Sequence, residues 1–400
     1  MGELIEVTRG MSLSGQYYAE NGELIRLTLG NFNMNGGGFK QNTSKTDLYF
    51  TGPVKQEYIL NEGDIITPLT EQSIGLLGTT ARIPESGKYI QSQDVAFIKC
   101  KTDLIDPNFC YYLVSSQLVR QQLSASAQQT KIRHTSPDKI KECVVWVPEL
   151  QEQKKIGKLL VDIDAKIELN RALNQNLEAL AKQLYDYWFV QFDFPNENGR
   201  PYKSSGGEMV WNERLKRDIP LNWSVTCIGN ILDKVISTLK LGTNEYLPSG
   251  QFPIIDQTTD VYYAGFTDRD DAVVRQYPAV VFGDHSCAVK YVNSPFVRGA
   301  DGTQIMLSKN PKISIEYLYY VVKDVRLGKG YARHFSLLKD HPIIIPERNV
   351  ADNFENIVQK LLRQITRNRE ETLSLTKQRD ELLSLLMNGQ VSVNSDLAHD

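Results

Sequence analysis

The sequence lacks several features that would assign it to a familiar class of protein. Its five cysteines include no Cys-x-x-Cys pair, which argues against structural zinc and favours a reducing compartment. No apolar run approaches the roughly 18 residues that a membrane helix needs, and the first residues form no signal-peptide core. The net charge is −3, so no overall positive charge points to nucleic acid. We therefore expect a soluble, cytoplasmic protein with no metal site.

Intact catalytic motifs are also missing. Residues 293–296 (Asn-Ser-Pro-Phe) resemble the Asn-Pro-Pro-Phe loop of amino-methyltransferases, but serine replaces the first proline. No glycine-rich loop for S-adenosylmethionine follows a strand. Residues 137–138 (Pro-Asp) with Glu152 and Lys154 spell a nuclease motif, yet Glu152 and Lys154 open a long helix instead of lying on a strand beside the aspartate. We expect no catalytic residue and no cofactor in this chain.

What the sequence does contain is one long stretch used twice, at about residues 149–189 and about 349–386. In each copy, seam residues recur at alternating steps of four and three, which is the heptad pattern of a coiled coil. Pro148 and Pro346 precede the copies at the same offset (346 − 148 = 198). The seam consists of Ile156, Leu160, Ile163, Ile167, Asn170, Asn174, Leu177, Ala181, Leu184 and Trp188, then Phe354, Val358, Leu361, Ile365, Asn368, Thr372, Leu375, Leu382 and Leu386, with Arg379 as the charged exception.

Such long amphipathic helices need a partner, and the other copy is the nearest one. The polar seam residues lie in the middle of both copies, so pairing along the full length would bring them together and fix the register. The segment between the copies includes a connector of about 30 residues, which favours an antiparallel pair because short connections are preferred.

The remaining sequence predicts an α+β fold with two mixed α/β globular regions and an internal pseudo-twofold repeat. Residues 317–321 correspond to residues 110–114, and the sequence around His334 corresponds to that around His134. We expect each of these two histidines to form a structural hydrogen bond. A helix is expected from Phe109 to Ser124 and a short buried strand from Lys141 to Val147. The predicted boundaries are 1–148 and 223–346 for the globular regions, 149–190 and 347–390 for the long helices, 191–222 for the connector and 391–400 for a flexible tail.

The connector carries the most specific motifs: Trp-Phe-Val at 188–190, Phe-Asp-Phe-Pro at 192–195, Pro-Tyr-Lys-Ser-Ser-Gly-Gly-Glu-Met at 201–209 and Ile-Pro-Leu-Asn-Trp at 219–223. Together with the order of the regions, these runs resemble the specificity subunits of Type I restriction–modification systems. The resemblance covers nearly the whole chain. One departure is that the first region begins at Met1-Gly2, without the strand-like lead that precedes Gly229. Either this strand is absent, or a C-terminal segment replaces it.

The resemblance implies a non-catalytic subunit with two target-recognition domains, each reading one half of a split, asymmetric site on double-stranded DNA. It also implies that the helices act as a spacer and as the dock for two methyltransferase subunits. Those subunits would bind S-adenosylmethionine, and nuclease–translocase subunits would join the complex. The lysines and arginines on the helices are read as solvated faces or partner contacts.

Base reading requires polar side chains that reach the edges of the grooves. The loops that offer such side chains supply the following candidates: Asn31, Asn33, Asn35, Lys40, Gln72, Ser73, Gln128, Gln129, Lys131 and Arg133 in the first region, and Gln257, Thr258, Tyr262, Tyr263, Asp284, His285, Arg298, Gln304, Lys329, Tyr331 and Arg333 in the second.

Two other functions remain open from the sequence. A self-sufficient DNA methyltransferase would need a cofactor loop, and binding of S-adenosylmethionine by the isolated chain would favour it. A coiled-coil scaffold accounts for the long helices, but it gives no reason for two large and divergent globular regions.

Overall fold

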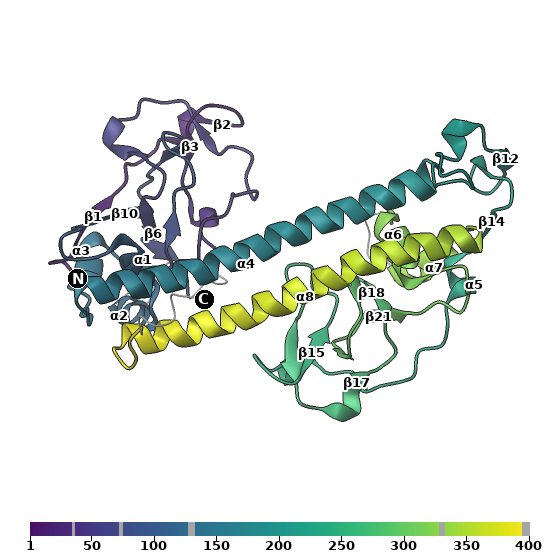
Figure 1. Cartoon of the computed structure of the whole chain (residues 1–400). Helices are drawn as coiled ribbons and strands as arrows, with labels where there is room; N and C mark the ends of the chain where they lie inside the picture. Colours follow the sequence, from purple (N-terminus) through teal and green to yellow (C-terminus); the bar gives the residue numbers. More distant parts are fainter. Residues whose placement is uncertain (34–36, 72–74, 127–132, 328–332, 394–400) are drawn as a thin grey trace. The chain divides into compact units, whose positions relative to one another are not determined.

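The computed structural model of the chain describes residues 1–33, 37–71, 75–126, 133–327 and 333–393. The chain divides into two compact units, Met1–Leu169 with Glu371–Asp400, and Asn170–Glu370. Each unit combines a globular region with a segment of each long helix, α4 (Leu150–Tyr185) and α8 (Arg348–Met387) (Figure 1). The two helices begin 198 residues apart (348 − 150 = 198), as the repeat predicts. The expected α+β fold with two long helices is thus observed.

The first unit is built on a four-stranded antiparallel sheet in the order β1–β10–β6–β8. Its strands are β1 (Ile5–Arg9), β10 (Val95–Cys100), β6 (Ile65–Pro68) and β8 (Ala81–Arg82). A second sheet has the order β2 (Tyr18–Ala19), β4 (Tyr49–Phe50), β3 (Ile25–Arg26), β9 (Tyr89–Ile90) and β5 (Ile59–Leu60), and β7 (Thr70–Glu71) pairs with β11 (Arg133–His134). The helices are α1 (Pro107–Ser115), α2 (Gln117–Ser126) and α3 (Pro137–Glu142).

The core of the first unit continues onto both long helices. Ile98 of β10 and Phe109 of α1 share one buried cluster with Ile156 of α4 and Leu386 of α8. The single helix predicted at 109–124 is two helices, because Ser116 adopts an extended conformation at the end of α1. The Ser116 hydroxyl then accepts a hydrogen bond from the Val119 amide, which caps the start of α2.

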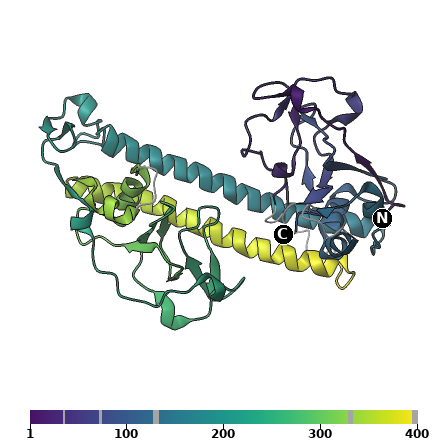
Figure 2. The ribbon, with the colours of Figure 1, turned by 180° about the vertical axis from the view of Figure 1, so that it is seen from behind.

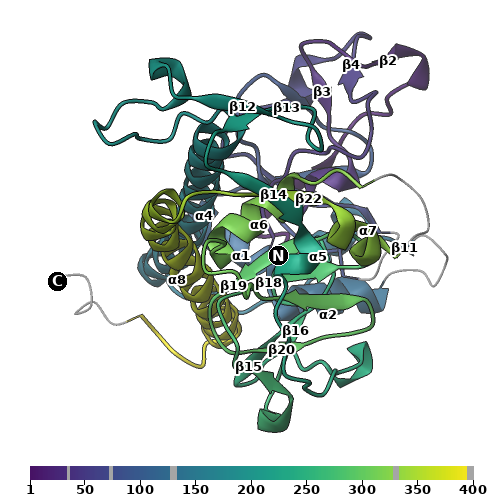
Figure 3. The ribbon, with the colours of Figure 1, turned by 90° about the vertical axis from the view of Figure 1, so that its right-hand side faces the viewer.

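The second unit also combines several small sheets with short helices. One sheet has the order β16 (Gly265–Thr267), β15 (Phe252–Ile255), β20 (Phe296–Arg298) and β17 (Val273–Val274), and another has the order β19 (Val289–Val292), β18 (Ala279–Gly283) and β21 (Thr303–Met306). Its helices are α5 (Ile228–Ile231), α6 (Ile315–Asp324) and α7 (His334–Asp340). β14 (Ser224–Cys227) pairs with β22 (Pro342–Ile345) beside α5, as Figure 3 shows.

The segments of α4 and α8 run antiparallel in each unit (Figures 1 and 2). In the second unit, Asn368 Nδ2 donates to Asn174 Oδ1 at 2.9 Å, and the rings of Trp188 and Phe354 lie 5.9 Å apart. Residue numbers therefore rise along α4 as they fall along α8. In the first unit, Asp164 pairs with the seam exception Arg379. All predicted seam residues are buried or half-buried.

The residues of the predicted connector pack onto the second unit. β12 (Met209–Asn212) and β13 (Arg217–Pro220) form a hairpin, and a π-helical turn at Asp186–Val190 ends α4. Phe194 stacks on Trp223 with ring centroids 4.9 Å apart, and both side chains are buried in the same cluster as Phe354 of α8. The aromatic residues of this segment therefore belong to a core.

The strand predicted at 141–147 is wrong. Residues 137–142 form α3, and the residues that follow adopt no regular structure. Val144 is 77% exposed and Trp146 is 44% exposed. No strand among the described residues pairs with this segment, whereas its counterpart β22 pairs with β14. A strand needs a neighbour to satisfy its backbone, and residues 141–147 have none within the described ranges.

The two units also differ at one buried polar group. Tyr112 of α1 donates to Asp164 Oδ2 at 2.6 Å, and Asp164 Oδ1 pairs with Arg379 at 2.9 Å. Burial and the neighbouring Asp164 carboxylate raise the pKa of Tyr112, so its hydroxyl remains a donor. The matching residue of α6 is Tyr320, since each is the sixth residue of its helix. The helix starts therefore correct the sequence match of 110–114 with 317–321 by one residue.

Apolar residues replace the two charges in the second unit. Asp164 and Leu362 are each the fifteenth residue of their long helix, and Arg379 matches Ala181 in the same way. Leu362, Ala181 and Tyr320 belong to one buried cluster. The Tyr320 hydroxyl has no hydrogen-bond partner among the described residues. The duplicated tyrosine therefore carries a hydrogen bond in one unit and a desolvation cost in the other.

We predict opposite results for the two Tyr→Phe substitutions. Tyr112→Phe should lower the free energy of unfolding by about 1.5–3 kcal/mol, the usual value of a hydrogen bond to a charged group. Tyr320→Phe is the matched control and should leave stability unchanged or raise it, because it removes a buried hydroxyl without a partner. Urea denaturation of the full chain measures both. Equal losses for the two variants would contradict this assignment.

Candidate nucleic-acid interface

Eight predicted DNA-contacting residues lie outside the described part of the chain, and for them the prediction stands as made. They are Asn35, Gln72, Ser73, Gln128, Gln129, Lys131, Lys329 and Tyr331. The other candidates are described, and the contacts of their side chains separate them into residues used inside the protein and residues at the surface.

In the first unit, Asn31 and Arg133 are used inside the protein. Asn31 is buried, its Oδ1 accepts from the Thr28 amide at 2.9 Å, and its Nδ2 donates to the Lys40 carbonyl at 3.2 Å. This pair of bonds closes the loop that presents Lys40, whose own side chain is exposed. Asn33 is half-buried in the same loop. Lys40 is thus held at the surface by a buried asparagine.

Arg133 forms an ion pair with a buried carboxylate that the sequence analysis did not single out. Its Nη1 lies 3.0 Å from Glu71 Oε1, and the Glu71 side chain is 2% exposed. Glu71 Oε2 accepts from the amides of Gly75, Leu76 and Leu77 at 2.8–3.0 Å. The carboxylate therefore fixes the loop after β7 against β11. A lone glutamate in a polar loop gives no sequence signal of burial, so this role could not be read beforehand.

Beside Glu71 lies a cleft of about 480 Å³ in the first unit. Its lining includes Tyr111, Arg120 and Ser124 from α1 and α2, together with Arg379 from α8. Arg120 donates to the carbonyl of Gly75, so the arginine is tied to the same loop as Glu71. None of these lining residues was a sequence candidate.

In the second unit, Gln257 brings three predicted loops together. Its Oε1 accepts from the His285 amide at 3.2 Å, and its Nε2 donates to the Asp301 carbonyl at 3.0 Å. Ser286 Oγ in turn donates to the Gln257 carbonyl at 2.6 Å. The loops at 256–258, 284–286 and 298–304 therefore form one surface, which we call the Gln257 loop cluster. His285 is exposed on it, and Thr258 and Gln304 are half-buried.

Asp284 fixes α7 to this cluster. Asp284 is buried, and its Oδ1 accepts from the Phe335 amide at 2.7 Å. The Asp284 carbonyl lies 2.9 Å from Nδ1 of the buried His334, in agreement with a structural role for this histidine. Arg333, which precedes α7, is exposed. Asp284 is thus a positioning residue, and Arg333 is the charge that this junction presents at the surface.

Arg298 is also used inside the protein. Its Nε donates to the Thr303 carbonyl at 2.7 Å, and Nη2 lies 3.4 Å from Gln304 Oε1. Burial lowers the pKa of Arg298 below its ordinary value. The guanidinium therefore braces the turn between β20 and β21.

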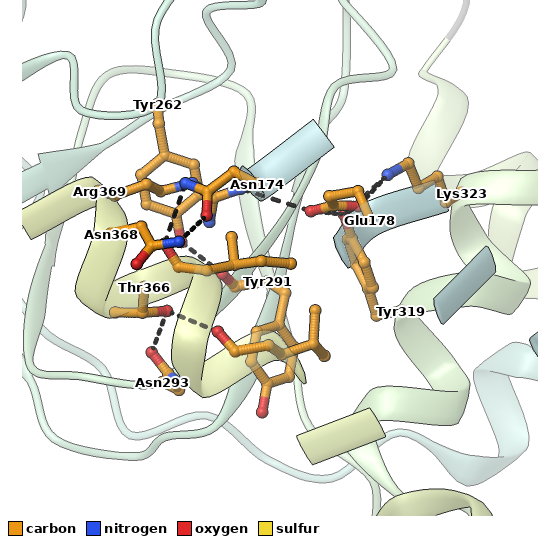
Figure 4. Close-up of polar contacts among 12 residues, drawn as sticks. Asn174, Glu178, Tyr262, Tyr291, Asn293, Tyr319, Lys323, Thr366, Asn368 and Arg369 are labelled. Carbon is orange, nitrogen blue, oxygen red and sulfur yellow. Dashed lines mark hydrogen bonds and ion pairs between the residues drawn. The ribbon is translucent and has the colours of Figure 1, made fainter. Parts of the chain in front are cut away.

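Tyr262 packs against α8 (Figure 4). The Arg369 guanidinium lies 4.1 Å from the centre of the Tyr262 ring, and the Tyr262 hydroxyl donates to the Tyr291 carbonyl. Tyr263 packs edge-on against Tyr262, and burial raises the pKa of Tyr263 to about 12. These two tyrosines therefore attach the 261–263 loop to the helix and to β19.

A polar network joins the second globular region to both helices (Figure 4). Glu178 of α4 accepts from Lys323 of α6 at 2.8 Å and lies 3.4 Å from Arg369 of α8. Thr366 donates to Asn293 Oδ1 at 2.9 Å, so the asparagine of the Asn-Ser-Pro-Phe run holds α8. That contact gives Asn293 a structural use.

Within the described ranges, no group of three or more His, Cys, Asp or Glu residues is placed to hold a metal ion. Glu152 and Lys154 lie on α4 and not on a strand, as the sequence predicts. In the described parts of the chain, no helix combines the length and apolar character that crossing a membrane requires.

We predict that Glu71→Ala lowers the free energy of unfolding by about 3–5 kcal/mol, because it leaves Arg133 and three amides without their acceptor. Glu85→Ala is the control: Glu85 pairs with Lys88 at 2.7 Å, but its side chain is 60% exposed, so the loss should stay below about 1 kcal/mol. Chemical denaturation measures both, and a small loss for Glu71→Ala would refute the bracing role.

Comparison with known proteins agrees with this architecture. A family model described as the Type I restriction modification DNA specificity domain matches residues 1–179. The Type I restriction enzyme MjaIX specificity subunit of Methanocaldococcus jannaschii is 24% identical over 314 residues, which cover 73% of this chain and 70% of that protein. The Type I restriction enzyme HindI specificity subunit of Haemophilus influenzae is 28% identical over 107 residues, 26% of this chain and 23% of that protein.

A solved structure shows the same fold. The S subunit of a Type I restriction–modification system from M. genitalium superposes with a TM-score of 0.59 at 18% identity, over 96% of this chain and 94% of that one. The family model over residues 1–179 and the relatives show that this chain is similar to specificity subunits of Type I restriction–modification systems, and the solved structure shows that it shares the fold of one of them.

Proposed function

We propose that this chain is the DNA-recognition subunit of a Type I restriction–modification complex, that it reads a bipartite, asymmetric site, and that it carries out no catalysis itself. The observation that carries the proposal is a duplicated scaffold with unlike loops. In the first unit, β11 is held beside β7 by the Glu71–Arg133 ion pair. In the second, Asp284 holds the start of α7 at the corresponding junction. Two similar frames with different surface chemistry suit two unlike half-sites.

The Gln257 loop cluster supplies the groups that reading a half-site needs. The amide of Gln304 and the imidazole of His285 both donate and accept hydrogen bonds, as base edges require. Arg333 and Lys40 are exposed cations, which suit phosphate contacts that position the duplex without reading sequence. The buried Asn31 and Asp284 and the half-buried Arg298 act as positioning residues that hold these loops.

The partners in this proposal are two methyltransferase subunits, which bind S-adenosylmethionine, and nuclease–translocase subunits that join them in the cytoplasm. Exposed apolar side chains on α4 support a protein contact along the helices. Leu173 is 42% exposed and Leu180 is 53% exposed, and their spacing of seven residues places them on one face. Such side chains are covered when a partner packs against the helix.

We predict that His285→Ala relaxes base selection in one half of the recognised site and leaves the other half unchanged, because the Gln257 loop cluster belongs to the second unit. Losing one base contact should reduce discrimination about tenfold at one position. The measurement is selection and sequencing of DNA bound from a randomised pool by the full chain assembled with methyltransferase subunits.

Gln257→Ala should affect the same half, since it releases the His285 and Asp301 loops together. Gln251→Ala is the matched control: it removes the same kind of side chain from an exposed position at the other end of β15. Relaxation of both halves by His285→Ala, or the same relaxation by Gln251→Ala, would refute the assignment of this surface to one half-site.

A further inference from the structure

Each unit contains one mixed sheet in which four strands have the same arrangement. Their order is β4–β3–β9–β5 in the first unit and β16–β15–β20–β17 in the second. In both sheets the two central strands are parallel, and each flanking strand is antiparallel to its neighbour. The loop that joins the first central strand to the next strand of the chain is therefore equivalent in the two units. It comprises residues 27–48, of which 27–33 and 37–48 are described, and residues 256–264.

A buried lysine holds both ends of the second loop. The Lys290 side chain comes from β19 and is 8% exposed. Its ammonium group donates to the carbonyls of Val261 and Tyr262 at 3.0 and 3.1 Å, and it lies 4.0 Å from Oδ1 of the buried Asp256. Asp256 Oδ1 also accepts from the Thr258 amide at 2.9 Å, which fixes the chain just after β15. Within the described ranges, every acceptor around this ammonium group belongs to the loop.

A buried arginine holds the end of the first loop. Arg26 of β3 is 6% exposed, and its guanidinium lies 3.8 Å from the centre of the Tyr18 ring. Its Nε and Nη2 donate to the Asp47 carbonyl at 3.2 and 3.0 Å, and Nη2 also donates to Asp47 Oδ1 at 3.2 Å. The Arg26 amide donates to the Leu48 carbonyl at 3.0 Å. Arg26 thus holds the first loop just before β4, as Lys290 holds the second just before β16.

The cation and the loop stabilise each other in both units. A buried cation loses its water, and this cost is offset only where acceptors replace the water. Burial lowers the pKa of Lys290, and the Asp256 carboxylate opposes this effect. A loop of exposed polar residues has little apolar packing to order it by itself, and in residues 40–46 only Asn42 is not exposed. The conformation that each loop presents therefore depends on its bonds to the buried cation.

We propose that Arg26 and Lys290 are positioning residues for DNA specificity, and that each sets base selection in one half-site by fixing the loop of its own unit. Neither cation contacts DNA, because both side chains are buried. Arg26 acts on the loop that carries Lys40, and Lys290 acts through Asp256 on the Gln257 loop cluster. This inference rests on the proposed function, because it assumes that these loops read the half-sites.

The substitutions Arg26→Met and Lys290→Met remove the hydrogen bonds of each cation and keep a long side chain in its place. In the full chain without DNA, each should speed amide hydrogen exchange about tenfold in its own loop only, close to the value of one hydrogen bond. The informative amides are those of Phe50 and Ala264, since each donates at 2.9 Å to a carbonyl on the other side of its loop. Mass spectrometry of fragments that contain these residues measures the rates.

The two substitutions should affect different halves of the recognised site when the full chain is assembled with methyltransferase subunits. Arg26→Met should reduce base discrimination about tenfold in one half only, and Lys290→Met should do so in the other half only. A loss of stability alone lowers the amount of active complex, but it does not change the bases that the remaining complex selects. Selection and sequencing of DNA bound from a randomised pool measures the discrimination.

Matched variants serve as controls. Arg9→Met and Lys312→Met remove exposed cations of the same types from the same units, and they should leave base selection and loop exchange unchanged. Arg26→Lys should retain most of the discrimination, because a lysine performs this role in the second unit.

Two milder variants decide the question if a methionine variant does not fold. Asp47→Ala removes one of the three hydrogen bonds of Arg26 from a side chain that is 48% exposed. Lys290→Gln removes the charge but keeps an amide donor. Each should reduce discrimination about threefold in its own half only, as expected for a weak polar contact.

Three results would overturn the proposal. The first is unchanged exchange in both loops, and the second is faster exchange with unchanged base selection. The third is relaxation of both halves by either substitution. A wild-type complex that selects no split motif would instead refute the proposed function, and the specificity role with it, whereas the three results above refute the role of the two cations alone.

Discussion

The pairing of the two heptad seams is the interaction on which each unit depends. Neither globular region closes its core alone: Ile156 and Leu386 complete the first, and Leu184 and Phe354 complete the second. The Asn174–Asn368 hydrogen bond fixes the register within the second unit, because a slip would leave a buried amide without a partner. The register in turn places Glu178 beside Lys323 and Arg369, which attach the second globular region to the helices.

The duplication has allowed the two units to diverge where the repeat alone would keep them alike. Tyr112 and Tyr320 occupy the same place in their helices, but charged residues surround the first and apolar residues the second. The charged set ties α1, α4 and α8 together in the first unit. In the second unit, apolar packing and the ion pairs of Glu178 hold the corresponding helices together. Equivalent positions of the two scaffolds are therefore stabilised by different interactions.

Periodicity and repetition made the helices predictable from sequence. A seam that recurs at a fixed offset specifies both the length of the helices and their partner, and the helices begin at Leu150 and Arg348. The prediction of a strand at 141–147 was wrong because a strand depends on pairing with a neighbour that is distant in sequence. Among the described site candidates, Asp284 and Arg298 are used for bracing, since residue type alone does not tell a buried polar group from an exposed one. The role of Gln257 follows from contacts with loops about 30 and 40 residues away, which no local pattern records.

The central claim is that this chain chooses the DNA site and its partners perform the chemistry. Base-resolution methylation mapping of the host genome, with and without the gene for this chain, tests it most directly. The account predicts that deleting the gene removes methylation from one split motif with two unlike halves, and that restoring the gene restores it. Unchanged methylation after deletion, or methyl transfer by the purified chain without other subunits, would contradict the account.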